Sequence, residues 1–273
     1  MKSKSKWITV PFAVWVIIFT VVPLVLILFF AFTNEDKIFT INNITHVGKY
    51  SSVFVNSLLL SAVATAICLI LGYPFAYLIS KMPEKVQSIA VILVMLPMLM
   101  NFLLRTYAWM TILENNGILN SVLKFFHLPA LNLINTKKAV VLGMVYNFLP
   151  YMILPIYSVL MKIDKRLIEA AKDLGAGKMK VFSKVIFPLS KPGVVSGVTM
   201  VFVPSVSTFV ISKMLGGGAN ILIGDLIEMQ FLGNSYNPHL GSAISLILIL
   251  LVLICIGILN QYDSSLNSKN KSQ

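Results

Sequence analysis

The stretch that decides the fold is Lys162–Pro188, which reads KIDKRLIEAAKDLGAGKMKVFSKVIFP. Its apolar residues recur at spacings of three and four in two groups: Leu167, Ala170, Ala171 and Leu174, then Met179, Phe182, Val185 and Ile186. This spacing predicts two short amphipathic helices. Gly175 and Gly177 stand between them, where a sharp turn needs a positive φ. We expect Pro188 to end the second helix and Pro192 to begin the next helical segment.

On both sides of this stretch the chain is too apolar for a soluble domain. Of its 273 residues, 57% are hydrophobic and only 12% are charged, whereas soluble domains carry roughly 25% charged residues. So little polar surface excludes a soluble or disordered chain and predicts an all-α polytopic membrane protein. A spanning helix needs about 20 mainly apolar residues. Six segments satisfy this requirement: 7–33, 56–80, 86–104, 139–161, 193–211 and 240–260.

The basic residues indicate how these segments are oriented. The net charge is +12, but no soluble domain is present to offer a basic patch to nucleic acid. The positive-inside bias of membrane proteins explains the excess instead. With the N-terminus inside, 15 of the 22 Lys and Arg residues fall on the cytoplasmic side, in segments 1–6, 81–85, 162–191 and 261–273. We therefore expect both termini and the stretch 162–191 to be cytoplasmic.

The sequence offers no catalytic or metal-binding motif. None of the three histidines has a second histidine three or four residues away, and the two cysteines lie in separate apolar runs. The glycine run at 216–218 lacks the Lys-Ser/Thr of a phosphate loop. We expect no cofactor, no metal and no ATP hydrolysis by the chain itself. An integral membrane enzyme is the alternative from a different class, but it needs clustered His, Asp or Glu residues, and the acids here are scattered.

A secondary transporter is a further alternative. It would require ionisable residues in the middle of its helices to couple substrate to ions. The predicted spans contain almost none, so the energy must come from outside the membrane part. The lysine-rich hairpin at 162–188 is either an anchor lying on the membrane surface or a docking element for a cytoplasmic partner. Ala170 and Ala171 would let another backbone approach closely, and Glu169 offers a charge.

The pattern of the hairpin resembles a known family. Glu169-Ala170-Ala171, Gly175 four residues later, and an apolar stretch ending at Pro188 resemble the EAA loop of ABC importer permeases, and 104 residues follow Glu169 here. The resemblance implies the type I ABC importer permease fold with six spanning helices. It also implies a set of ATPase-coupling residues: Glu169, Ala170, Ala171, Leu174, Gly175, Phe182 and Pro188.

Four segments resemble one subgroup of that family, the spermidine/putrescine permeases. These segments are 105–109, 143–155, 173–176 and 215–231. This implies a multi-pass permease subunit of the cell membrane for polyamine import. The implied partners are a sister permease in a heterodimer, two ATPase subunits that bind the ATP, an external polyamine-binding protein and the lipid bilayer. A permease for another small solute remains the alternative. We divide the chain into an N-terminal helix and loop (1–55), a permease core (56–260) with its coupling loop (162–191), and a tail (261–273).

A path for polyamines should offer carboxylates and aromatic faces to a flexible polycation. On the predicted outer side the candidates are Tyr107, Trp109, Glu114, Tyr151, Asp225 and Glu228. Aromatic residues near a membrane boundary are also typical of the interface belt. Asp225 and Glu228 lie three residues apart, so on a helix they share a face. That face could line the path, dock the external binding protein, or simply be exposed to solvent.

Overall fold

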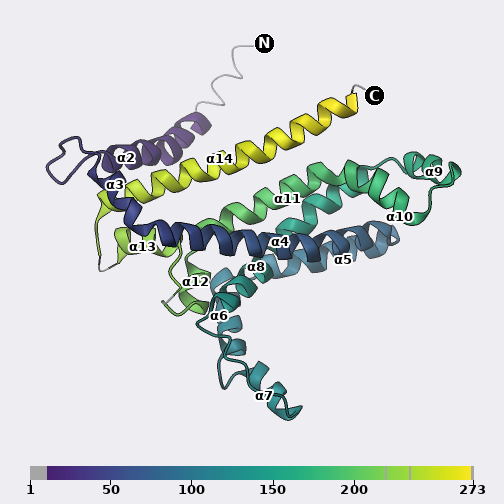
Figure 1. Ribbon diagram of the computed structural model, residues 1–273, viewed down its shortest axis with the longest axis horizontal. Helices are drawn as coiled ribbons and strands as arrows, with labels where there is room; N and C mark the ends of the chain where they lie inside the picture. Colours follow the sequence, from purple (N-terminus) through teal and green to yellow (C-terminus); the bar gives the residue numbers. More distant parts are fainter. Residues whose placement is uncertain (1–10, 219, 234, 272–273) are drawn as a thin grey trace. The chain divides into compact units, whose positions relative to one another are not determined.

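The computed structural model describes residues 11–218, 220–233 and 235–271. The described residues are helical, with one isolated bridge between Thr33 and Phe39 (Figure 1). The predicted basic start 1–6 and residues 7–10 of the first predicted span lie outside the described residues. The chain divides into two compact units, Met1–Phe54 with Leu226–Leu253, and Val55–Asp225 with Ile254–Gln273.

The first unit contains the first spanning helix, Pro11–Ala31. It comprises the π-helix η1 (Ile17–Val21) and α2 (Val22–Ala31), and is followed by α3 (Asn42–Val47) and η2 (Gly48–Tyr50). The beginning of α14 (Pro238–Lys271) belongs to the same unit. There the His239 ring lies edge-on to Phe30, with 5.3 Å between centroids, and its Nδ1 is 3.1 Å from the Phe30 carbonyl oxygen.

The second unit carries most of the membrane-spanning helices. Its elements are α4 (Ser51–Lys81, which begins in the first unit), α5 (Glu84–Leu99), α6 (Phe102–Leu113), α7 (Ile118–Phe125), α8 (Lys137–Lys162), α9 (Lys165–Asp173), α10 (Lys178–Val181), η3 (Phe182–Ile186), α11 (Phe187–Ser207), α12 (Val210–Leu215) and the start of α13 (Ile223–Leu232). Across the described residues, five helices are long and apolar enough to cross a membrane, or six if the bent pair α5 and α6–α7 is one span. The all-α class is confirmed.

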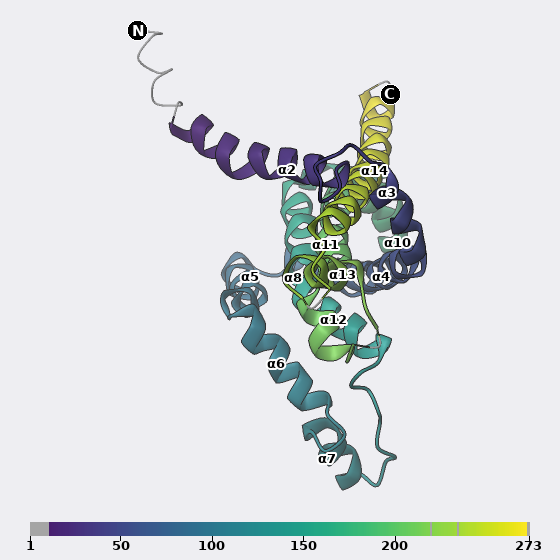
Figure 2. The same ribbon diagram turned by 90° about the vertical axis from the view of Figure 1, so that its left-hand side faces the viewer.

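The third predicted span, 86–104, is wrong as a single straight helix. α5 ends at Leu99 and the following helices leave it at 88°, a bend visible in Figure 2. The Asn101 side chain accepts the backbone N–H of Leu103 at 2.8 Å and of Leu104 at 3.4 Å. An Asn in this position starts a new helix. The buried Arg105 guanidinium then donates to the carbonyl of Pro97, near the end of α5.

The boundaries predicted around the fifth span are also wrong. Pro188 does not end a helix, because one continuous helix runs from Lys178 to Ser207. A proline lacks the N–H of a regular helical turn and its ring excludes a carbonyl one turn back. The π-helix η3 lets the helix continue past Pro188, because its hydrogen bonds reach one residue further back: the N–H of Phe187 donates to the carbonyl of Phe182, five residues earlier. A π-helix also precedes Pro23: in η1 the N–H of Val22 donates to the carbonyl of Ile17.

The core of the second unit is the packing of α11 against α8. Glycines on α11 make this approach possible: a Cβ on Gly193 would lie 3.0 Å from Ile156 Cα, and one on Gly197 would lie 2.8 Å from Met152 Sδ. Both Ile156 and Met152 are fully buried. Small residues at such crossings let two membrane helices come close enough for backbone packing.

Candidate coupling site

The hairpin predicted from Lys162–Pro188 is present as α9 and as the helix that starts with α10. The backbone N–H of Arg166 donates to the Asp164 carboxylate at 2.9 Å, which caps the start of α9. Asp164 therefore fixes where the coupling loop turns away from the end of α8. The predicted pair of short helices is confirmed, except that the second continues into α11.

The turn between the helices depends on Gly175. Its φ is +78°, a conformation that glycine adopts without a steric penalty. The N–H of Ala176 donates to the Ala171 carbonyl at 3.0 Å, and that of Gly175 donates to Lys172 at 2.8 Å. These two bonds form a Schellman motif that ends α9. Gly177, by contrast, has φ of −64°, so the prediction of a positive φ at this second glycine is wrong.

The apolar residues of the hairpin form two faces rather than one. The inner face contains Ile168, Ala171, Val181, Phe182 and Ile186, which pack against the core of the second unit. The outer face contains Leu167, Ala170, Leu174 and Met179, all of which are exposed. Leu174 and Met179 expose 88% and 78% of their surface. The single stripe predicted for the first helix is therefore wrong, because Ala171 turns inward while its predicted neighbours turn outward.

An aromatic cluster joins the inner face to α4. It consists of Tyr73 and Tyr77 on α4, Phe182 on η3 and Phe187 on α11. The Phe182 ring lies edge-on to Tyr77 and Tyr73, with centroid distances of 5.3 and 5.9 Å. Phe187 lies 5.7 Å from Tyr73. Such aromatic pairs contribute about 0.5–1.5 kcal/mol each beyond their buried area.

Sequence reasoning selected Phe182 but missed its two tyrosine partners. Tyr73 and Tyr77 lie four residues apart near the end of α4, so they share one face of that helix. This spacing indicates from the sequence that the two tyrosines form one aromatic face, but it does not indicate which segment of the chain packs against that face.

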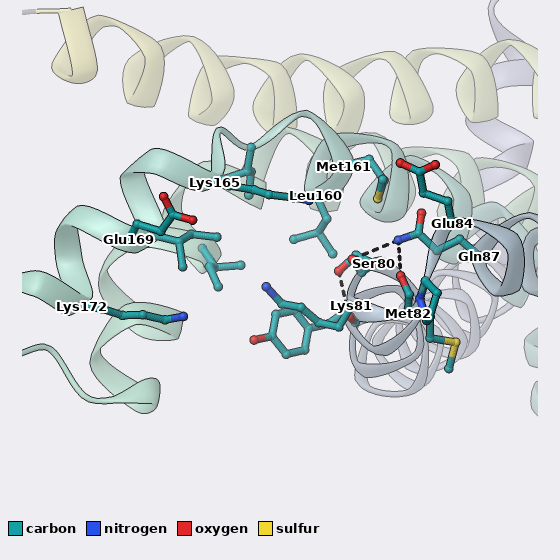
Figure 3. A pocket seen from close by; sticks show the side chains of 15 residues that line it. Ser80, Lys81, Met82, Glu84, Gln87, Leu160, Met161, Lys165, Glu169 and Lys172 are labelled. Atoms are coloured by element: carbon teal, nitrogen blue, oxygen red, sulfur yellow. Dashed lines mark hydrogen bonds between the residues drawn. The ribbon is translucent and has the colours of Figure 1, made fainter.

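Hydrogen bonds of the Gln87 side chain fix the turn between α4 and α5. The buried Gln87 side chain donates to the carbonyls of Met82 at 2.7 Å and Ser80 at 3.4 Å (Figure 3). Its Oε1 accepts the Tyr157 hydroxyl of α8 at 3.2 Å. Gln87 therefore ties the α4–α5 turn to the helix from which the coupling loop emerges. Neither Gln87 nor Tyr157 was singled out from the sequence.

The predicted path residues have varied surroundings. Trp109 lies edge-on to Tyr146, a residue outside the predicted set, with 5.1 Å between centroids. The Arg105 guanidinium lies 6.0 Å from the same Tyr146 ring. Tyr107 and Tyr151 are exposed. The contact with Tyr146 gives Trp109 a packed position between α6 and α8.

The carboxylates of the predicted set also differ. Glu114 is exposed at the end of α6. Asp225 is only 7% exposed, and its Oδ2 accepts the backbone N–H of Leu222 at 2.8 Å, where α13 begins. Simple solvent exposure is therefore wrong for Asp225. Glu228 is half-buried one turn further along α13.

The sequence that forms these spanning helices and this hairpin matches a protein family. Residues 2–263 match the family described as "Binding-protein-dependent transport system inner membrane component". The chain belongs to this family, so it is a membrane permease subunit of an ABC importer whose ATP is bound by separate ATPase subunits. The expectation drawn from the EAA-like loop is confirmed at this level.

Individual relatives point to one branch of the family. The chain is 38% identical over 265 residues to the spermidine/putrescine transport system permease protein PotB of Haemophilus influenzae, covering 93% of this chain and 92% of that protein. It is 35% identical over 282 residues to PotB of Salmonella typhimurium, covering 98% of each. Its fold is similar to that of a bacterial ABC transporter involved in alginate import, with a TM-score of 0.82, 15% identity and 96% of each chain covered.

Proposed function

We propose that the chain is the permease subunit of an importer for spermidine and putrescine. The observation that carries the proposal is 35–38% identity over nearly the full length to relatives named for these two substrates. The chain would pair with a sister permease, receive substrate from an external polyamine-binding protein, and be driven by two ATPase subunits. Residues 56–260 would form the permease core, with 1–55 an added helix and loop and 261–273 a tail.

The coupling loop supports the ATPase partnership through its outer face. Leu167 and Leu174 lie outside the long spanning segments, Met179 is the second residue of one, and all three side chains are exposed. Exposed apolar side chains at the end of a membrane-spanning segment are typical of a protein contact. Ala170 lets the partner approach closely and Glu169, also exposed, offers it a charge. The outer face would sit in a groove of the ATPase.

The aromatic cluster supports a route from that contact into the membrane. Phe182 belongs to the same continuous helix as the hairpin's second half, and its ring contacts both tyrosines of α4. A shift of the hairpin would therefore displace α4 and α11 together. Closure of the ATPases would in this way switch the permease between two packings, inward-facing and outward-facing.

On the outer side we assign the substrate path to Tyr107, Trp109, Glu114, Tyr151, Asp225 and Glu228. Trp109, whose ring lies edge-on to Tyr146, offers an aromatic ring to an ammonium group. Asp225 also shapes the start of α13 through its bond to Leu222. We expect the half-buried Glu228 and the exposed Glu114 to act on the passing substrate as well.

The test is uptake by the complete transporter in proteoliposomes. The chain is co-purified with its sister permease and ATPases, and the binding protein is added outside. We expect ATP-dependent accumulation of labelled spermidine and putrescine that stops when the binding protein is left out. A matched complex with Gly175→Val should bind ATP without accumulating substrate. Uptake of another solute, with no uptake of either polyamine, would replace the proposed substrate class while keeping the permease role.

A further inference from the structure

A cavity of about 410 Å³ lies beside the coupling loop (Figure 3). Its walls come from the end of α4, the start of α5, the end of α8 and one side of α9. All of these elements belong to the second unit. The volume falls in the range of ligand pockets, about 300–1,000 Å³. Neither the transport path nor the outer face of the hairpin includes this cavity.

Lysines from two helices face the cavity. Lys81 is the last residue of α4, while Lys165 and Lys172 belong to α9. In Figure 3 the ammonium groups of Lys81 and Lys172 point toward one another across the open space. Glu84 and Glu169 also line the cavity, and in that view their carboxylates lie above the two ammonium groups. Two like charges that face one another are unfavourable unless an anion lies between them.

The other polar side chains of the cavity are already occupied. The Ser80 hydroxyl donates to the Tyr77 carbonyl at 2.7 Å, and Gln87 is held by Met82 and Tyr157. Within the described parts of the chain, the cavity's lysines form no ion pair. The Lys81 ammonium lies 5.3 Å from the Tyr77 ring centroid, which holds it at the cavity wall. The lysines are thus the donors left for a ligand.

Part of the cavity's lining is apolar. It consists of Leu160, Met161, Ile163, Ile168 and Ile186. α4 and α8 are spanning helices that end at this cavity, at Lys81 and Lys162. The cavity therefore lies where the hydrocarbon region gives way to the headgroup region. An anion that fits this lining carries both a phosphate and carbon chains.

We propose that this cavity binds the phosphate of an anionic phospholipid headgroup, with Lys81 and Lys172 holding the phosphate oxygens between them. The apolar part of the lining takes the glycerol backbone and the first carbons of the acyl chains. The phosphate bridges α9 to the α4–α5 turn and so fixes the coupling loop on the body of the permease. The site does not depend on which solute is transported. A soluble phosphate compound is the other source of the same chemistry.

The test is ligand binding to the transporter complex, purified with its partner subunits and stripped of lipid. Native mass spectrometry measures binding of three probes: dioctanoyl-phosphatidylglycerol, glycerol phosphate and dioctanoyl-phosphatidylcholine. We expect phosphatidylglycerol to bind at least tenfold more tightly than either of the other two. Equal binding of glycerol phosphate and phosphatidylglycerol would assign the site to a soluble phosphate and overturn the lipid.

Double variants that each remove two positive charges, from the cavity or from elsewhere on the loop, show where the lipid binds. The double variant Lys81→Gln/Lys172→Gln should lose at least tenfold in affinity, while Lys81→Arg/Lys172→Arg should retain most of it. Lys178→Gln/Lys184→Gln is the matched control, because both lysines lie on the same loop and neither lines the cavity. Retained binding in the first variant, or equal loss in the control, would overturn the proposal. Assembly of each complex is checked by gel filtration, and the arginine pair keeps the test decisive if the glutamine pair fails to assemble.

Discussion

The hydroxyl oxygen of Tyr73 lies 2.8 Å from the hydroxyl oxygen of Ser190, although 117 residues separate them in the chain. Tyr73 belongs to α4 and Ser190 to α11, so one hydrogen bond joins the two helices at the end of the predicted coupling loop. Ser190 in turn donates to the Phe187 carbonyl at 2.9 Å, which settles Tyr73 as the donor to Ser190. The hydroxyl of Tyr73, a member of the aromatic cluster, is thus hydrogen-bonded to α11.

Tyr73→Phe keeps the ring contacts and removes this bond. A lost hydrogen bond with a buried partner costs about 1 kcal/mol, so the stimulation of ATP hydrolysis by loaded binding protein should fall several-fold. Ser190→Ala should have the same effect, and the double variant should be no worse than either single change. The measurement is stimulated ATP hydrolysis in proteoliposomes. Additive losses in the double variant would show that the two hydroxyls act separately.

Gly175→Ala should weaken coupling, whereas Gly177→Ala should not. Both glycines have open space where a Cβ would lie, so the two substitutions differ in backbone conformation alone. A non-glycine residue at the φ of +78° at Gly175 costs about 1 kcal/mol or more, and it loosens the turn that ends α9. Substrate-driven ATP hydrolysis by the two reconstituted variants is compared directly. Equal activity would mean that the turn tolerates strain.

Leu174→Ser and Phe182→Ala should separate docking from transmission. Leu174 lies on the outer face, so its loss should weaken retention of the ATPase subunits during purification. Phe182 lies on the inner face, and its loss should leave the ATPases bound but uncouple their activity from substrate. Co-purification and stimulated ATP hydrolysis are measured for both variants. Loss of ATPase retention in Phe182→Ala alone would reverse the assignment of the two faces.

The hairpin should be cytoplasmic and the α6–α7 turn external, because basic residues concentrate on the hairpin's side. Cysteine at Lys178 should be protected in intact cells from an impermeant thiol reagent, while cysteine at the exposed Asn116 should react. Both positions should react in broken cells. Labelling of Lys178→Cys from outside would invert the topology and remove the ATPase contact with it.

Glu228→Gln should reduce uptake of spermidine more than uptake of putrescine, because the effect of a lost carboxylate grows with substrate charge. A partly screened contact contributes about 1 kcal/mol, and high salt should diminish the difference. Glu114→Gln, at an exposed position, should show a smaller effect. Initial uptake rates for both substrates give the ratio. An equal loss for the two polyamines would indicate a folding or docking defect instead.

The all-α membrane class and the hairpin followed from composition and periodicity, because burial in lipid demands long apolar runs and a turn such as that at Gly175 demands glycine. The bend after Leu99 could not be predicted in the same way. Residues 86–104 are mostly apolar, and the break depends on one Asn101 side chain that caps a new helix. A hydropathy profile averages over about 20 residues, so it does not detect a helix break that depends on one side chain.

The contacts of the candidate site were less predictable than its location. The position of Pro188 suggested a helix end, but a single π-turn lets the helix continue. Ala171 and Leu174 also fell on different faces although their spacing suggested one, because α9 ends at Asp173 and Leu174 already belongs to the turn. The partners of Phe182 lie about a hundred residues earlier in the chain, and periodicity carries no information on such long-range pairs.

The continuous helix from Lys178 to Ser207 has a mechanical consequence. It rests on α8 where Gly193 and Gly197 allow close contact, and this contact can serve as a fulcrum. At 1.5 Å per residue, the arm from Lys178 to Gly193 is about 22 Å long, and the arm from Gly197 to Ser207 is about 15 Å long. A rigid tilt that carries Lys178 one way therefore carries Ser207 the opposite way, about two thirds as far. Opening at one membrane face and closing at the other become a single motion of one lever.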